Sequence, residues 1–106
     1  MNIDYKKLIE AAKNTSYNSY SSYSRYAVGS AVLTENNKIY LGANIENASY
    51  GLTNCAERSA LFNAVSNGYT RIKAIALWTP KPDTLPCGAC FQVLVELAFN
   101  ASYYKV

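Results

Sequence analysis

The sequence contains no histidine. This absence removes the commonest general base, the commonest metal ligand and every Ser/His or Cys/His nucleophile pair. Any chemistry must therefore use cysteine, a carboxylate, tyrosine or a metal held by other ligands. The chain offers three cysteines, seven acidic residues and ten tyrosines for that purpose.

Long apolar runs are also lacking, since none approaches the roughly 18 to 20 residues that a membrane span needs. The segment from Met1 to Glu10 carries charges where a signal peptide would carry its apolar stretch. The formal charge of +3 is mild, and the basic residues are scattered instead of forming a stripe for a phosphate backbone. We therefore expect a cytoplasmic protein with no membrane partner and no polynucleotide partner.

The length and composition predict one folded domain spanning residues 1–106. Half of the residues are hydrophobic and 16% are charged, a balance typical of globular proteins and too apolar for a disordered chain.

Apolar periodicity predicts helices and strands in alternating order. A helix is expected from Asp4 to about Ser16, with Asp4 suited to its cap, and another from Asn54 that ends at Asn67-Gly68. The other expected elements are a surface loop from Tyr17 to Arg25, strands at Tyr26 to Thr34, Lys38 to Glu46, Arg71 to Thr79 and Ser102 to Val106, and a helix from Cys87 to Phe99. The first two strands form a hairpin, because Asn36 and Asn37 between them tolerate positive φ. This order predicts an α/β architecture with a mixed sheet layered with helices.

All three cysteines fall at or near predicted helix starts. Cys55 opens the second helix, and Cys87 and Cys90 lie at the start of the third. A helix N-terminus favours the thiolate that a metal requires, because its N–H groups carry partial positive charge. Two helices lying side by side on one sheet would bring the three thiolates around one tetrahedral zinc, with a fourth position open for water, as in catalytic sites.

Simpler interpretations exist for each residue taken alone. A single cysteine is usually a small buried hydrophobe, and a Cys-x-x-Cys pair alone is also typical of redox pairs. Glu57, two residues after Cys55, would suit a proton shuttle facing the fourth zinc position. The segment Asn54-Cys55-Ala56-Glu57 also has capping-box spacing, with Asn54 as the N-cap and Glu57 reaching back.

Cys55-Ala56-Glu57, followed by Pro86-Cys87-Gly88-Ala89-Cys90, resembles the signature of the cytidine deaminase family, in the small form with three cysteine ligands. Tyr23-Ser24-Arg25-Tyr26-Ala27-Val28-Gly29 resembles its first-strand segment, and the stretch from Asn44 to Tyr50 resembles its nucleoside-binding segment. The resemblance covers nearly the whole chain. It implies a three-layer α/β/α cytidine deaminase-like fold, which would lack the family's C-terminal strand and helix because the sequence stops at Val106.

The resemblance implies zinc-dependent hydrolytic deamination of cytidine or deoxycytidine, with water attacking C4 of the pyrimidine. The implied zinc ligands are Cys55, Cys87 and Cys90, and the implied proton shuttle is Glu57. The implied substrate contacts are Tyr26 on the base, Asn44 and Glu46 on the ribose, and Ala56. For Asn44 and Glu46 the alternative is a solvated strand end, and for Tyr26 it is the core.

Arg58 is implied as a donor to the ligand sulfurs, because three thiolates leave the zinc site with a net charge of about −1. Its alternative is an exposed helix arginine. The family also implies a homotetramer with Tyr50 near the subunit boundary. Two other functions stay open: deamination of another aminopyrimidine nucleoside of the antibiotic type, and a truncated zinc-binding chain with little activity.

Overall fold

The computed structural model describes residues 4–80, 92–93, 96 and 102–105. Its elements in chain order are α1 (Tyr5–Ser16), β1 (Gly29–Thr34), β2 (Ile39–Ala43), the 3₁₀ helix η1 (Tyr50–Leu52), α2 (Ala56–Ser66), β3 (Ile72–Trp78) and β4 (Ser102–Lys105). The strands form one sheet in the order β2-β1-β3-β4. Strand β1 is antiparallel to both β2 and β3, whereas β4 is parallel to β3, so the sheet is mixed as predicted.

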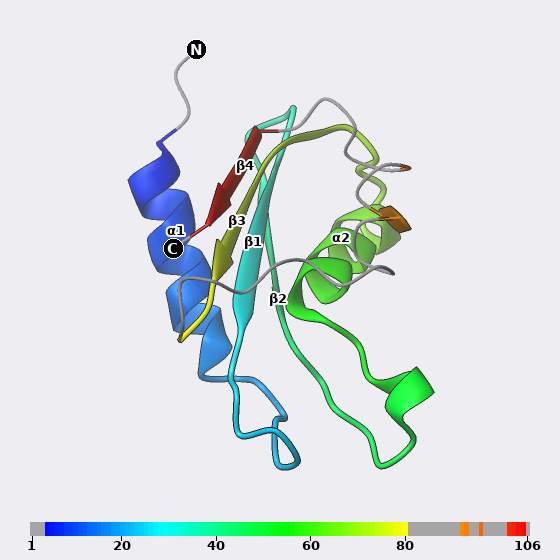
Figure 1. Cartoon of the computed structure of the whole chain (residues 1–106). Helices are drawn as coiled ribbons and strands as arrows, with labels where there is room; N and C mark the ends of the chain where they lie inside the picture. Colours follow the sequence, from blue (N-terminus) through cyan, green and yellow to red (C-terminus); the bar gives the residue numbers. More distant parts are fainter. Residues whose placement is uncertain (1–3, 81–91, 94–95, 97–101, 106) are drawn as a thin grey trace.

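Helices α1 and α2 cover opposite faces of the sheet (Figure 1). Helix α1 packs mainly against β1 and β3, and α2 packs mainly against β2 and β1. The described elements therefore form three layers, helix on sheet on helix, which confirms the predicted architecture. Each face has its own apolar core, and neighbouring residues of β1 such as Ala31 and Val32 belong to opposite cores.

The core under α1 is built largely from alanine. Leu8 and Ala12 of the helix pack against Ala31, Ala74 and Ala76 of the sheet. Asp4 caps the helix, since its carboxylate accepts a hydrogen bond from the Lys7 N–H at 3.1 Å. The predicted first helix is therefore confirmed, including its cap.

The core under α2 is larger in side-chain volume and includes Leu61, Val32 and Ile75. Helix α2 ends at Asn67 as its C-cap, and Gly68 follows with φ of +92°, a conformation that favours glycine. The predicted end of this helix is confirmed. Strand β3 is buried along most of its length, as its nearly continuous apolar sequence predicted.

The hairpin forms as predicted, with Asn37 at φ of +64°, but both strands are shorter than expected. Strand β1 begins at Gly29 and β2 ends at Ala43, so Tyr26, Asn44 and Glu46 lie in loops.

The strands end early because a distant segment replaces the hairpin partner. The backbone N–H of Tyr20 donates to the Asn44 carbonyl at 3.0 Å, and the Glu46 N–H donates to the Tyr20 carbonyl at 2.8 Å. After Ala43, the chain therefore pairs with the loop that follows α1.

The last predicted helix, from Cys87 to Phe99, falls mostly outside the described residues. Its described members, Gln92, Val93 and Glu96, are helical. The final predicted strand is present as β4, which ends at Lys105.

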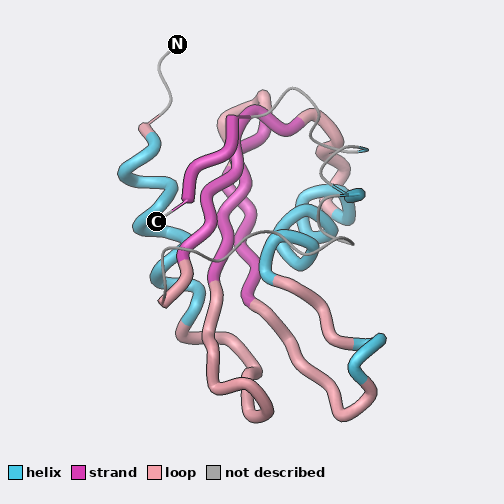
Figure 2. The backbone as a smooth tube through the Cα atoms, in the orientation of Figure 1, coloured by secondary structure: helices cyan, strands magenta, loops and turns pink. Residues whose placement is uncertain are grey.

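Loops from two parts of the sequence gather at one end of the sheet (Figure 2). One loop follows α1, and the other joins β2 to α2 through η1. No helix within the described ranges combines the length and apolarity that crossing a bilayer requires.

The contact between β2 and α2 depends on Gly42. A Cβ atom at this position would lie 2.2 Å from the Ala60 nitrogen and 2.7 Å from the Ala56 carbonyl oxygen, and both are backbone atoms of α2. We expect Gly42→Ala to lower the free energy of unfolding by about 1–3 kcal/mol or more, because the helix must move away from the strand. Urea unfolding measures this loss.

Gly51→Ala is the matched control, since a Cβ atom there meets nothing within 4 Å. Equal stability of the two variants would contradict the close contact.

Candidate active site

The candidate site begins at the N-terminus of α2. Cys55 is the N-cap, with φ of −76° and ψ of 158°, and its side chain makes no capping hydrogen bond to the first turn of α2. Ala56 is buried as the first helical residue, and Glu57 follows with only 4% of its side chain exposed. A thiol and a carboxylate thus lie in the same helical turn, at the positive end of the helix dipole.

The capping-box interpretation of Glu57 is wrong. The N-cap is Cys55 and not Asn54, so Glu57 is the second helical residue, one position short of the place that a capping-box acid occupies. The Asn54 amide instead donates to the Ser59 hydroxyl at 3.0 Å. Helix capping therefore does not explain why an acidic residue is buried here.

Arg58 contacts the sulfur of Cys55. Its Nη2 lies 3.5 Å from Cys55 Sγ and also donates to the Thr53 carbonyl at 3.2 Å. The guanidinium is part-buried in this arrangement, so the alternative of an exposed helix arginine is wrong. A cation beside the sulfur favours its thiolate form, the form that ligates a metal.

Asn44 is buried, and its side chain holds the loop before β1. Its Oδ1 accepts hydrogen bonds from the Ser19 hydroxyl and from the Val28 N–H, and its Nδ2 donates to the Tyr26 carbonyl at 2.9 Å. The interpretation of Asn44 as a solvated strand end is therefore wrong. The side chain takes the place of ladder hydrogen bonds beyond the end of β1.

Glu46 holds the same loop nearer its tip. Its Oε1 accepts from the N–H groups of Tyr23 and Ser24 at 3.1 and 2.9 Å, and its Oε2 accepts from the Ser24 hydroxyl. Burial raises the pKa of the Glu46 carboxyl, but these hydrogen bonds outweigh it and hold the pKa below its usual value. The carboxylate is therefore charged at neutral pH.

Backbone pairing brings these groups to the start of α2. Ile45, between Asn44 and Glu46, exchanges two hydrogen bonds of 2.8 Å with Asn54, which precedes Cys55. The predicted residues Tyr26, Asn44, Glu46, Ala56, Glu57 and Arg58 thus belong to segments that are directly linked.

Cys87 and Cys90 lie outside the described residues, and Tyr50 begins η1. Within the ranges that the structure describes, no three side chains of a metal-ligating type cluster together. Cys55 nevertheless fits a zinc ligand, because it lies at a helix N-terminus with a guanidinium at its sulfur.

Ser19 and Ser24 were missed as contributors to the site. Both lie in the Ser-rich stretch that was predicted as a surface loop, and their hydroxyls bind Asn44 and Glu46. Only the motif Tyr23-Ser24-Arg25-Tyr26 contained a signal that could have indicated Ser24.

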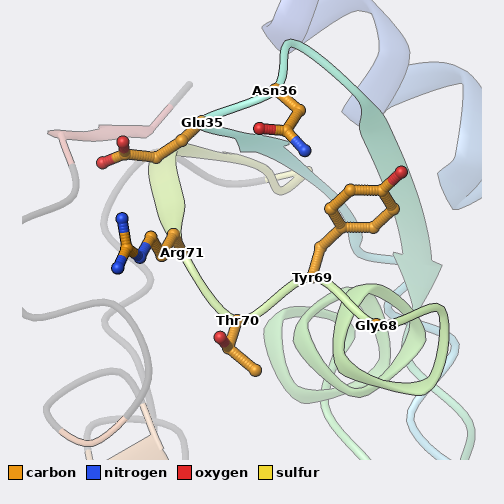
Figure 3. A pocket seen from close by; sticks show the side chains of 6 residues that line it. All are labelled: Glu35, Asn36, Gly68, Tyr69, Thr70 and Arg71. Atoms are coloured by element: carbon orange, nitrogen blue, oxygen red, sulfur yellow. The ribbon is translucent and has the colours of Figure 1, made fainter.

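A separate hollow of about 220 Å³ lies at the opposite end of α2 (Figure 3). It is lined by Glu35, Asn36, Gly68, Tyr69, Thr70 and Arg71. None of these residues was predicted to take part in a site, and the segment from Gly68 follows the C-terminus of the helix. The hollow is therefore distinct from the site at Cys55.

The mixed sheet, the helix on each face, and the cysteine and buried glutamate in one turn fit the zinc-dependent deaminase fold that the sequence resemblance implies. Residues 2–106 match the cytidine and deoxycytidylate deaminase zinc-binding region. The chain belongs to this family.

Curated relatives and solved structures agree with this assignment. A cytidine deaminase of Halalkalibacterium halodurans is 50% identical over 96 residues, which cover 90% of this chain and 73% of that protein. One of Sporosarcina psychrophila is 46% identical over 95 residues, or 89% of this chain and 70% of that protein. The crystal structure of cytidine deaminase from Burkholderia pseudomallei superposes with a TM-score of 0.91 at 42% identity, covering 98% of this chain and 87% of that one.

Arg58 offers a test of the electrostatics at Cys55. We expect Arg58→Ala to weaken zinc binding about 10- to 100-fold, because the cation beside the sulfur is lost. Competition with a chelator measures the affinity. Arg71→Ala is the control, since Arg71 is exposed beside the distant hollow. Equal zinc affinities of the two variants would show that Arg58 does not act on the metal site.

Proposed function

We propose that this chain catalyses the zinc-dependent hydrolysis of cytidine and 2′-deoxycytidine to the uracil nucleoside and ammonia. The observation that carries the proposal is the first turn of α2, where Cys55, buried Glu57 and the Arg58 guanidinium lie together. Relatives that are 40–50% identical carry the name cytidine deaminase, which supports the same reaction.

Zinc would be held by Cys55, Cys87 and Cys90. When bound, it supplies a Lewis acid that makes water nucleophilic at neutral pH. Three thiolates against the +2 charge of zinc leave a net charge of about −1, which weakens such an acid. The hydrogen bond from Arg58 to Cys55 Sγ draws charge from the sulfur and so opposes this effect.

Glu57 would move the protons. In the reaction, the water oxygen bonds to C4 while one of its protons passes to the ring nitrogen N3. The second proton then passes from the new C4 hydroxyl to the amino group, which leaves C4 as ammonia. One carboxylate at a fixed position can accept the first proton, deliver it to N3 and assist the departing amine. Its burial in the first turn of α2 supports this role, because a buried carboxylate is shielded from competing water.

The hydrogen-bonding capacity of Asn44 and Glu46 fits a sugar hydroxyl. Among the described residues, Asn44 Oδ1 accepts two hydrogen bonds and Asn44 Nδ2 donates one. The second N–H of Nδ2 is therefore left to donate to a ligand. Glu46 receives three hydrogen bonds against about four acceptor sites, which leaves one. A ribose hydroxyl that accepts from Asn44 and donates to Glu46 would use both, which favours a nucleoside substrate.

Tyr26 would pack on the base. Its carbonyl is bound by Asn44 Nδ2, and its N–H donates to the Ser24 hydroxyl at 3.0 Å, so its backbone is fixed on both sides. Ala56, at the start of α2, would line the same pocket. These assignments, the single domain over residues 1–106 and the cytoplasmic location stay predictions.

Glu57→Gln tests the reaction most directly. We expect zinc content to stay at one equivalent while turnover of cytidine falls by more than the ~10²–10⁴ of an ordinary acid-base group, because one carboxylate serves several proton transfers. Loss of cytidine absorbance measures turnover, and metal analysis measures zinc. Cys55→Ser should lose both, whereas Glu10→Gln, an exposed acid on α1, should lose neither.

Near-normal turnover of Glu57→Gln would contradict the role of Glu57. A zinc-loaded parent chain that is inactive on every aminopyrimidine nucleoside would favour the zinc-binding chain with little activity. Activity on another such nucleoside, without activity on cytidine, would favour the antibiotic-type alternative.

We further propose that the chain assembles as a homotetramer with Tyr50 near the subunit boundary. Tyr20, Ile45 and Leu52 support an interface, because these large side chains are 57%, 52% and 71% exposed on the paired loops. Sedimentation velocity is expected to show a tetramer that Leu52→Ser weakens, since the substitution removes apolar area.

Ile39→Ser is the control for assembly, because Ile39 is exposed at the opposite end of β2. A parent chain that sediments as a stable monomer would contradict the proposal.

A further inference from the structure

Ser24 connects two of the residues proposed to bind the nucleoside. Its hydroxyl donates to Glu46 Oε2 and accepts a hydrogen bond from the Tyr26 N–H at 3.0 Å. Its own N–H donates to Glu46 Oε1 at 2.9 Å. One exposed serine therefore bridges the carboxylate of Glu46 and the backbone of Tyr26.

Arg25, which lies between Ser24 and Tyr26 in the sequence, adopts a backbone conformation that surrounding contacts must stabilise. Arg25 has φ of +58°, in the left-handed region that non-glycine residues rarely enter, and its N–H donates to the Ser21 carbonyl at 2.7 Å. Such a conformation persists where surrounding contacts impose it, and these conformations concentrate at functional sites. The bridge of Ser24 lies immediately before Arg25, and the Asn44 hydrogen bond to Tyr26 lies immediately after it.

The bridge involves a charged acceptor. Hydrogen bonds to a carboxylate are stronger than those between neutral groups. Because the pKa of Glu46 lies below its usual value, the carboxylate keeps its charge at neutral pH. Losing the Ser24 hydroxyl would remove one charge-assisted bond to Glu46 and, at the same time, the hydrogen bond from the Tyr26 N–H.

We propose that Ser24 is a positioning residue whose hydroxyl holds Glu46 and Tyr26 in the relative placement that one nucleoside requires, with Glu46 toward the sugar and Tyr26 toward the base. The nucleoside part of this inference rests on the proposed function. The bridge itself rests only on the hydrogen bonds of Ser24.

Limited digestion with trypsin tests the hydrogen-bonded bridge of Ser24 and requires neither substrate nor metal. It cleaves after Arg25, which is exposed in the middle of the bridged loop. We expect Ser24→Ala to speed cleavage between Arg25 and Tyr26 about tenfold or more, because loss of a hydrogen bond to a charged group favours local opening. Mass spectrometry identifies the peptide that ends at Arg25. Ser24→Thr, which keeps the hydroxyl, should restore slow cleavage.

Ser22→Ala is the matched control, an exposed serine in the same loop. Thermal melting of all the variants near the parent value shows that the fold is intact. Equal cleavage rates for Ser24→Ala and Ser22→Ala would overturn the bridge.

Kinetics of the zinc-loaded protein test the positioning. We expect Ser24→Ala to raise KM for cytidine about tenfold while kcat changes less, because the sugar and base contacts loosen and Glu57 is untouched. The increase in KM should be smaller for 2′,3′-dideoxycytidine, because its sugar lacks the hydroxyls that Glu46 would bind. Ser24→Thr should recover the parent KM.

An unchanged KM in Ser24→Ala, or an equal increase in KM for cytidine and 2′,3′-dideoxycytidine, would overturn the positioning role. A zinc-loaded parent chain that does not turn over cytidine rejects the proposed function and the nucleoside part of the inference. Faster cleavage of Ser24→Ala in that same chain would still support the bridge, so the two failures are distinguishable.

Discussion

The close contact between β2 and the first turns of α2 determines where the candidate site lies. Gly42 lets the helix backbone approach the strand to a distance that any side chain would block, since its Cβ would lie 2.7 Å from the Ala56 carbonyl oxygen. Ala56 separates Cys55 from Glu57, so the same contact fixes the thiol and the carboxylate relative to the sheet. Beyond β2, the pairing of Ile45 with Asn54 ties the entry of the helix to the same strand.

The loops around this helix end are held by side chains, where a regular sheet would use its backbone. Asn44 and Glu46 accept hydrogen bonds from backbone N–H groups that have no partner in a strand ladder. The half-buried N–H of Val28 needs such a partner, because leaving a buried backbone group unsatisfied costs about 1–3 kcal/mol. The residues proposed to bind the sugar are therefore also structural, and each keeps only part of its hydrogen-bonding capacity for a ligand.

The absence of histidine shapes the proposed chemistry of the site. A set of three cysteine ligands carries more negative charge than a set with a neutral imidazole, and this charge opposes the activation of water. Arg58 lies one position after Glu57 on α2, and its guanidinium reaches Cys55 Sγ. The start of the helix thus places a thiol, a buried carboxylate and a guanidinium within four consecutive residues.

The sequence by itself determined the features that depend on chain neighbours. Apolar periodicity predicted α1, α2 and β3. The turn residues Asn37 and Gly68, both of which have positive φ in the structure, indicated where the hairpin turns and where α2 ends. The three cysteines and Glu57 could also be singled out from their spacing, and the family resemblance together with the charge of three thiolates indicated Arg58. Only the tertiary structure decided where the hairpin strands end and what Ser24 does, because the partners of these loops come from segments about 20 residues away along the chain. Apolar periodicity does not encode such pairings. They form only when α1 and α2 pack on the sheet that contains β2 and the connecting loops come together at one end of it.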